Sequence, residues 1–208
     1  VGTFKKSAIE IHHAALALWT GRSLTHLVTE CLKNRVGRLR PDFLSRCRWD
    51  TALAACTGKA DSIRDGRESF PSGHSSTAFA GMTFLALWIA GQTAAWCFSI
   101  PTPSGTLVRT RMCRFVVCLL PLAYSTWVAI SRLEDYRHHK EDIIVGALIG
   151  ALCSSICYFM YWPSPFSAAS FNSEQVGRPR VDYAAYDYPE RRSGSYQLTR
   201  LQDDTEHV

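Results

Sequence analysis

The stretch Ser69–Ser76, SFPSGHSS, joins a charged loop to a long run that contains no charged residue. A helix that begins here has no internal partners for its first backbone N–H groups, and its dipole favours a bound anion. Gly73 lets the backbone approach a bound group, Ser72 offers a hydroxyl, and His74 carries a proton that can move near neutral pH. The stretch therefore predicts an anion site at the start of a helix.

The uncharged run after this stretch is one of three in the chain. No Asp, Glu, Lys or Arg occurs in residues 75–108, 115–131 or 143–173. A soluble core helix rarely goes so long without a charged face, and about 20 apolar residues cross a bilayer. We therefore predict membrane helices at about 76–97, 113–131 and 143–162.

A fourth and weaker candidate for a membrane helix is the segment 8–32. It carries Glu10, Arg22, His26 and Glu30, so the alternative is a partly wet or interfacial helix. The chain begins with Val and lacks the layout of a signal peptide. We expect an N-terminally truncated chain and an all-α, integral membrane bundle with about four transmembrane helices.

The cysteines and the C-terminal segment indicate little chemistry. Six of the eight cysteines lie in or beside apolar segments, where Cys behaves as a small hydrophobe. Cys47 and Cys56 share a polar loop, and both a disulfide and two free thiols remain open. Residues 163–208 are rich in polar residues and Pro and lack helical periodicity, so we predict a disordered tail after a membrane domain at 1–162.

Three adjacent spans place the loops alternately on the two sides of a membrane. The loops 33–75 and 132–142 then share one side, and the loop 98–112 shares the other side with the tail. The positive-inside rule puts Arg109, Arg111 and Arg114 in the cytosol. The loop 33–71 holds nine Lys and Arg against five Asp and Glu, an excess that a bound anion on the opposite side would explain.

Three motifs fall on that shared side: Lys33, six residues and Arg40-Pro41; then Pro71-Ser72-Gly73-His74; then Ser131-Arg132, five residues, His138, three residues and Asp142. Arg matches phosphate oxygens with two parallel hydrogen bonds, whereas Lys acts as a point charge. Together the motifs supply three cations (Lys33, Arg40 and Arg132) and two neutral donors (Ser72 and Gly73). This set can hold a phosphate dianion without a metal.

The two histidines of these motifs suggest phosphoryl transfer. His138 and Asp142 are four residues apart, so on a helix they lie on one face, and the carboxylate can orient the imidazole. An oriented neutral imidazole is a nucleophile toward phosphorus. His74 comes from a different helix and can protonate the leaving oxygen. The expected intermediate is a phosphohistidine that water hydrolyses.

The three motifs, in this order, resemble the signatures of the type 2 phosphatidic acid phosphatase family, also called lipid phosphate phosphatases. The stretches VGRLRPDFLSRC and YRHH are most similar to its fungal and plant branch, which includes diacylglycerol pyrophosphate phosphatases. The resemblance implies a six-helix membrane fold shared with vanadium haloperoxidases, no cofactor or metal, and two further helices upstream. It implies that His138 is the nucleophile, Asp142 its orienter and His74 the acid and base. The phosphate-binding residues that it implies are Lys33, Arg40, Ser72, Gly73 and Arg132.

The expected activity is dephosphorylation of phosphatidate, lysophosphatidate or diacylglycerol pyrophosphate. The alternatives are a phosphatase for sphingoid base phosphates or polyprenyl diphosphates, and a non-catalytic lipid-binding scaffold. The expected partners are the lipid substrate and the bilayer, with no nucleic acid. The expected location is a multi-pass membrane protein with its site on the non-cytosolic face; the preferred lipid, the organelle and the oligomeric state do not follow from the sequence.

Overall fold

The computed structural model describes residues 2–99, 110–171 and 179, with the side chains of the helical residues from Ala8 onward. Four long helices form its body: α1 (Gly2–Val36), α4 (Gly73–Thr93), α5 (Arg111–Glu134) and α6 (Lys140–Tyr161). The short elements are α2 (Phe43–Cys47), β1 (Trp49–Asp50), β2 (Ala55–Cys56), α3 (Ala60–Asp65) and the 3-10 helix Ala168–Phe171. The strands β1 and β2 pair antiparallel, with Trp49 opposite Cys56.

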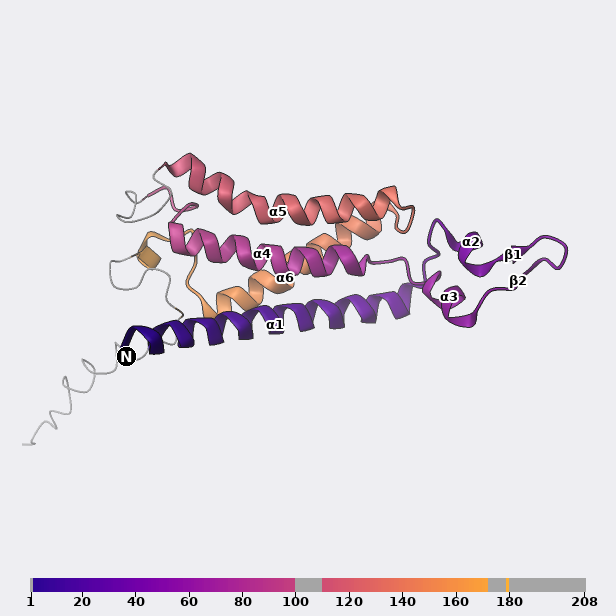
Figure 1. Ribbon diagram of the computed structural model, residues 1–208, viewed down its shortest axis with the longest axis horizontal. Coiled ribbons are helices and arrows are strands. Elements are labelled where there is room, and N and C mark those ends of the chain that lie inside the picture. Colours follow the sequence, from indigo (N-terminus) through magenta and orange to yellow (C-terminus); the bar gives the residue numbers. More distant parts are fainter. Residues whose placement is uncertain (1, 100–109, 172–178, 180–208) are drawn as a thin grey trace, which may run out of the picture.

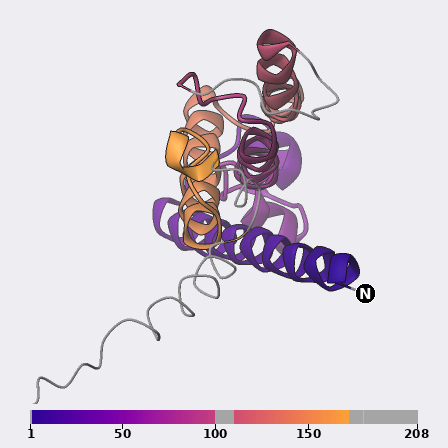
Figure 2. The same ribbon diagram turned by 90° about the vertical axis from the view of Figure 1, so that its left-hand side faces the viewer.

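Each of the four predicted segments is a helix, and the helices lie side by side (Figure 1). The C-terminal ends of α1 and α5 meet the N-terminal ends of α4 and α6 at one end of the bundle. In the view along the bundle, α4 lies between α1 and α5 (Figure 2), and it packs against α6, α5 and α1. The three motifs therefore reach the same end of the bundle.

The prediction of four membrane spans is corrected by the structure. Among the described residues, two helices are long and apolar enough to cross a membrane, α5 and α6. Helix α4 has no charge, but its first turns carry His74, Ser75, Ser76 and Thr77. The sequence argument counted charges, and uncharged polar residues lower hydropathy as well.

The outer faces of α5 and α6 are apolar. Along α6, exposed large side chains recur every four residues: Ile144, Leu148, Leu152, Ile156 and Met160. On α5, Leu120, Trp127 and Ile130 are also exposed. Apolar stripes of this length on a helical surface are typical of contact with lipid or with further protein.

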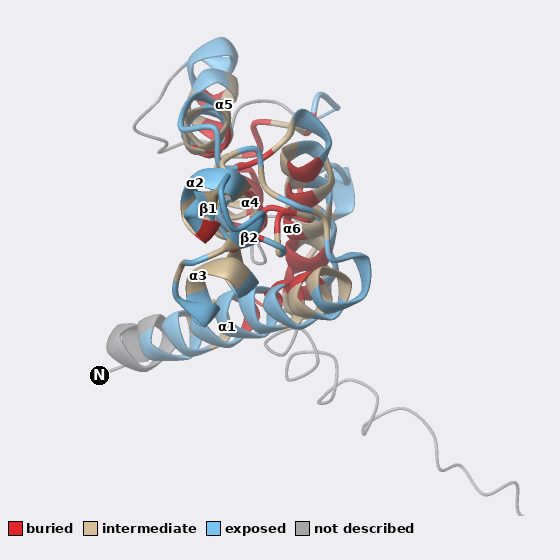
Figure 3. Ribbon diagram, turned by 90° about the vertical axis from the view of Figure 1, so that its right-hand side faces the viewer, coloured by how far each residue is buried: buried red, intermediate tan, exposed pale blue. Residues whose placement is uncertain are grey.

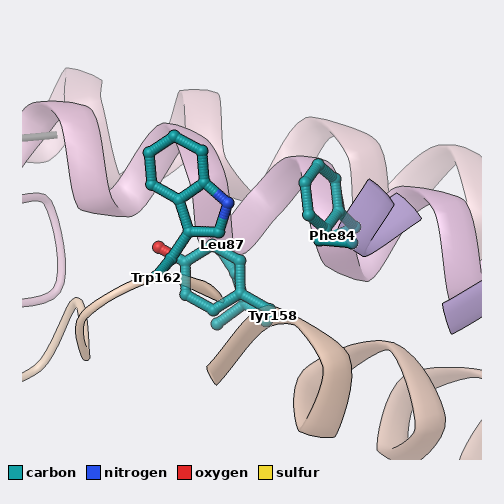
Figure 4. Close-up of a cluster of buried hydrophobic side chains, with 5 residues drawn as sticks. Phe84, Leu87, Tyr158 and Trp162 are labelled. Atoms are coloured by element: carbon teal, nitrogen blue, oxygen red, sulfur yellow. The ribbon is translucent and has the colours of Figure 1, made fainter. Parts of the chain in front are cut away.

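The centre of the bundle is the contact between α4 and α6. Gly146 and Gly150 face α4 so closely that a Cβ on Gly146 would lie 2.6 Å from the Ser72 carbonyl oxygen. Small residues allow this close approach, as they do in membrane helix pairs. Farther along, Phe84 and Leu87 pack on Tyr158 and Trp162 (Figure 4). The ring centroids of Phe84 and Tyr158 are 5.9 Å apart.

The polar segment from α2 to α3 covers the site end of the bundle. Figure 3 looks onto this end: the segment is mostly exposed, while buried residues follow α4 and α6 behind it. Cys47 and Cys56 in this segment are free thiols. At the opposite end, Arg114 is buried and donates to the Thr93 carbonyl oxygen (2.5 Å) at the last turn of α4. Most of the predicted tail, and Arg109, lie outside the described residues.

Candidate active site

A cavity of about 700 Å³ opens at the site end, between α1, α4 and α5. Five of the residues predicted for the site line it: Lys33, Arg40, Gly73, His74 and His138. The polar lining continues along α1 with Arg22, His26, Thr29 and Glu30. Its apolar side comes from α4 and α5, including Ala78, Met82 and Val128. The cavity thus combines a cationic end with an amphipathic extension between the helices.

His138 lies in the connector between α5 and α6 and is 2% exposed. Its Nδ1 is 2.8 Å from the Ser69 carbonyl oxygen. A carbonyl oxygen only accepts, so Nδ1 carries the proton and the lone pair of the neutral ring is on Nε2. The pKa of His138 is lowered to about 4, mainly by burial and in second place by the positive charge of Arg40, while the Ser69 carbonyl and Asp142 act in the opposite direction. The ring is therefore neutral over the physiological pH range.

Asp142 lies in the first turn of α6 and is fully buried. Its Oδ2 is 3.9 Å from His138 Nδ1, which is beyond hydrogen-bond distance. Oδ2 instead accepts from the Ser69 hydroxyl (2.5 Å) and from the His139 backbone N–H (3.0 Å). Oδ1 accepts from Arg38 Nη1 (2.8 Å). The direct contact with His138 that the four-residue spacing suggests is thus replaced by a contact through Ser69.

The N-terminus of α4 lies against Lys33. Ser72 caps this helix, its side chain accepting from the Ser75 backbone N–H (3.4 Å). A Cβ on Gly73 would lie 3.4 Å from Lys33 Nζ. The ammonium group and the positive end of the helix dipole therefore meet at the cavity, where His74 also lies. Two positive ends this close favour an anion between them.

Arg40 contributes a second cation to the cavity, where it is held by Asp65. Its Nε donates to the Asp65 backbone carbonyl oxygen (2.9 Å) and its Nη2 to Asp65 Oδ1 (2.8 Å). Lys33 is held in a similar way by Glu30, with Nζ 2.8 Å from Oε1. Both acidic residues also line the cavity. A phosphate that enters competes with these carboxylates for the two cations.

Three predicted site residues do not line the cavity. Ser72 is fully buried, and its backbone N–H donates to the Asp142 carbonyl oxygen (2.9 Å). Asp142 is behind His138, as described above. Arg132 Nη2 is 3.1 Å from Asp135 Oδ2 and 3.3 Å from the Ser131 hydroxyl. The structure therefore brings five of the eight residues to one cavity. Ser72 and Asp142 are buried next to the cavity, and Arg132 pairs with Asp135 at the end of its own helix.

Sequence reasoning missed two side chains beside His138. Arg38 was assigned no role, whereas it pairs with Asp142 and Glu141. Ser69, which opens the quoted stretch, was assigned no role. The placement of Arg22, His26 and Glu30 along the cavity agrees with the alternative of a partly wet α1. Within the described ranges, no three His, Cys, Asp or Glu side chains are arranged to hold a metal ion.

The fold and the cavity define a helical bundle with a cationic, histidine-containing site at one end. Residues 14–165 match the model of the PAP2 superfamily, and the chain belongs to this superfamily. It is 34% identical over 170 residues to lipid phosphate phosphatase 2 of Arabidopsis thaliana, covering 78% of this chain and 55% of the relative.

Two more relatives extend the comparison. The chain is 37% identical over 149 residues to diacylglycerol pyrophosphate phosphatase 1 of Saccharomyces cerevisiae, covering 67% of this chain and 48% of the relative. It is 31% identical over 176 residues to phospholipid phosphatase 1 of Rattus norvegicus, with coverages of 79% and 57%. The chain thus spans about half the length of these curated relatives. No solved structure matches it.

Proposed function

We propose that this chain carries the active site of a membrane phosphatase that hydrolyses lipid phosphates, with phosphatidate, lysophosphatidate and diacylglycerol pyrophosphate as substrates. The observation that carries the proposal is the setting of His138. Its Nδ1–H donates to the Ser69 carbonyl oxygen, and its neutral ring lies in one cavity with His74, Lys33 and Arg40. The names of the PAP2 relatives support the substrate class.

In the proposed reaction, Nε2 of His138 attacks phosphorus and the P–O bond to the lipid breaks. His74 donates its proton to the departing alkoxide, and Lys33 and Arg40 stabilise the charge on the phosphoryl oxygens. Water then attacks the phosphohistidine, with His74 as the base, and releases inorganic phosphate. The first backbone N–H groups of α4, at Gly73, supply neutral donors to the same oxygens.

The other predicted residues act from the edge of the cavity. Ser72 fixes the N-terminus of α4, and Asp142 supports His138 from behind. Arg132 binds the phosphate when it exchanges Asp135 for a phosphate oxygen. No metal takes part in this proposal.

The test is phosphate release from micellar phosphatidate in the presence of EDTA. We expect the wild-type chain to release phosphate and His138→Ala to release none, because the variant lacks the imidazole that attacks phosphorus. We also expect His74→Ala to lower phosphate release strongly, because His74 serves both the formation and the hydrolysis of the intermediate. Activity that requires a divalent cation, or a His138→Ala variant with wild-type turnover, would contradict the proposal.

The alternatives are separated by the same assay. A phosphatase for sphingoid base phosphates or polyprenyl diphosphates releases phosphate from those lipids and not from phosphatidate. A lipid-binding scaffold binds vesicles and releases nothing. The exposed apolar stripes of α5 and α6 support a multi-pass membrane protein. The same proposal includes a membrane domain at 1–162 and a site on the non-cytosolic face.

A further inference from the structure

Ser69 contacts both members of the His138–Asp142 pair. Its carbonyl oxygen accepts from His138 Nδ1–H at 2.8 Å, and its hydroxyl donates to Asp142 Oδ2 at 2.5 Å. All three residues are at most 2% exposed. A single buried residue thus connects an imidazole and a carboxylate that are 3.9 Å apart and do not bond directly.

Arg38 completes this connection from the other side of Asp142. Its Nη1 is 2.8 Å from Asp142 Oδ1, and its backbone carbonyl oxygen accepts from the Ser69 N–H at 3.0 Å. Arg38 therefore neutralises the buried carboxylate and also anchors the backbone of Ser69. The imidazoles nearest to this carboxylate are His139, with Nδ1 3.3 Å from Oδ2, and the buried His138, at 3.9 Å. A buried carboxylate that loses its cation turns toward groups able to take a positive charge, and of these two rings His138 is the one buried beside it.

We propose that Ser69 and Arg38 are positioning residues of this site, which hold Asp142 away from His138 and keep the imidazole neutral with its lone pair on Nε2. The proposal rests on the proposed function, in which this nitrogen attacks phosphorus. Asp142 then acts on the nucleophile indirectly, by fixing Ser69. This arrangement favours nucleophilic attack by His138, because only the neutral imidazole has a lone pair for that step.

The charge balance around His138 decides the direction of the test. The titratable and charged groups that line the two cavities beside His138 are Arg22, His26, Glu30, Lys33, Arg38, Arg40, Asp65, His74, Tyr124, Glu134, Tyr136, His139, Lys140 and Glu141, and Asp142 lies behind the ring. Of these, Asp142 is the carboxylate that favours the charged ring, and Arg40 opposes it. Loss of a partner of Asp142 therefore raises the pKa of His138 from about 4 toward its ordinary value of 6.5.

The main variant is Ser69→Ala, which removes the hydroxyl and leaves the carbonyl. We expect kcat to fall by about 10- to 100-fold, as for lost supporting hydrogen bonds elsewhere, with KM nearly unchanged. The acidic limb of the pH–rate profile should move toward neutral pH. Ser69→Thr, which keeps a hydroxyl, should restore both. Ser45→Ala is the matched control, because Ser45 is an exposed residue of the same loop region.

Arg38→Gln provides a second variant at a side chain that is 35% exposed. We expect the same upward shift of the acidic limb, and no further shift when it is combined with Ser69→Ala, since both act on Asp142. Arg64→Gln is its control, because Arg64 pairs on the surface with Glu68. A loss of folded protein alone would lower turnover at every pH and leave the limb in place.

A readout that needs no turnover separates this inference from the proposed function. Diethyl pyrocarbonate acylates neutral imidazole, and mass spectrometry of the 138–139 peptide gives the pH midpoint for His138. We expect a midpoint near 4 in the wild type and in Ser45→Ala, and a clearly higher one in Ser69→Ala and Arg38→Gln. If the chain releases no phosphate but the midpoint shifts, the proposed function fails and the positioning role stands. Unshifted midpoints in both variants overturn the positioning role.

Discussion

Gly146→Ala tests the close packing of α6 on the N-terminus of α4. The added Cβ would lie 2.6 Å from the Ser72 carbonyl oxygen, and an ordinary contact begins at 3.4 Å, so the two backbones must separate by about 0.8 Å. The Ser72 N–H to Asp142 carbonyl bond, 2.9 Å, spans the same contact and would lengthen. Overpacking of this kind costs about 1–3 kcal/mol of folding free energy.

The expected loss of activity is comparable in free energy to the loss of stability. A displacement near 1 Å between reacting groups costs about 100-fold in rate, so kcat should fall by about 10- to 100-fold. The thermal unfolding midpoint should fall by about 2–12 °C for a chain of this size. Both are measured on the purified protein in micelles, by phosphate release and by circular dichroism.

The matched control for this prediction is Gly21→Ala. Its added Cβ would meet Ser154 Cα on the same α6 helix at 3.4 Å, which is an ordinary contact. It should keep wild-type turnover and be neutral or slightly stabilising, because Ala favours helix more than Gly by about 1 kcal/mol. Wild-type kcat and unfolding midpoint in Gly146→Ala would refute the claim that this packing sets the site geometry.

Three further predictions concern the charges of the site. The pKa of His138 in the folded protein, about 4, is below its ordinary value of 6.5. The free energy of unfolding should therefore be highest above pH 6.5 and fall by about 3 kcal/mol as the pH drops toward 4. Unfolding midpoints measured across this pH range should show the decrease, and His138→Gln should lack it. Glu30→Gln releases Lys33 from its ion pair and should lower the inhibition constant of inorganic phosphate by about 2- to 5-fold, measured in the release assay. Arg132→Ala should raise KM by about tenfold if Arg132 leaves Asp135 for the substrate, and a KM equal to that of wild type would remove it from the site.

The helices and the placement of the motifs follow from the sequence alone. Uncharged runs, the weaker candidate at 8–32 and the alternation of loops predict four helices and the meeting of Lys33, His74 and His138 at one end, because successive membrane spans place their loops alternately on the two sides. All of these features depend on spacing along the chain. The predicted number of membrane spans was less accurate, because α4 has no charged residue but contains Ser, Thr and His, which lower its hydropathy.

The tertiary structure decided which partners the polar groups take. The spacing of His138 and Asp142 predicts a contact, but Ser69, about 70 residues away in the chain, takes the Nδ1–H at 2.8 Å. Arg38, one of several arginines in its loop, is distinguished only by its approach to Asp142, and Arg132 is held by Asp135 instead of lining the cavity. A hydrogen bond depends on differences of less than an ångström in atoms brought together by packing, and a sequence pattern fixes positions only along the chain and around a helix.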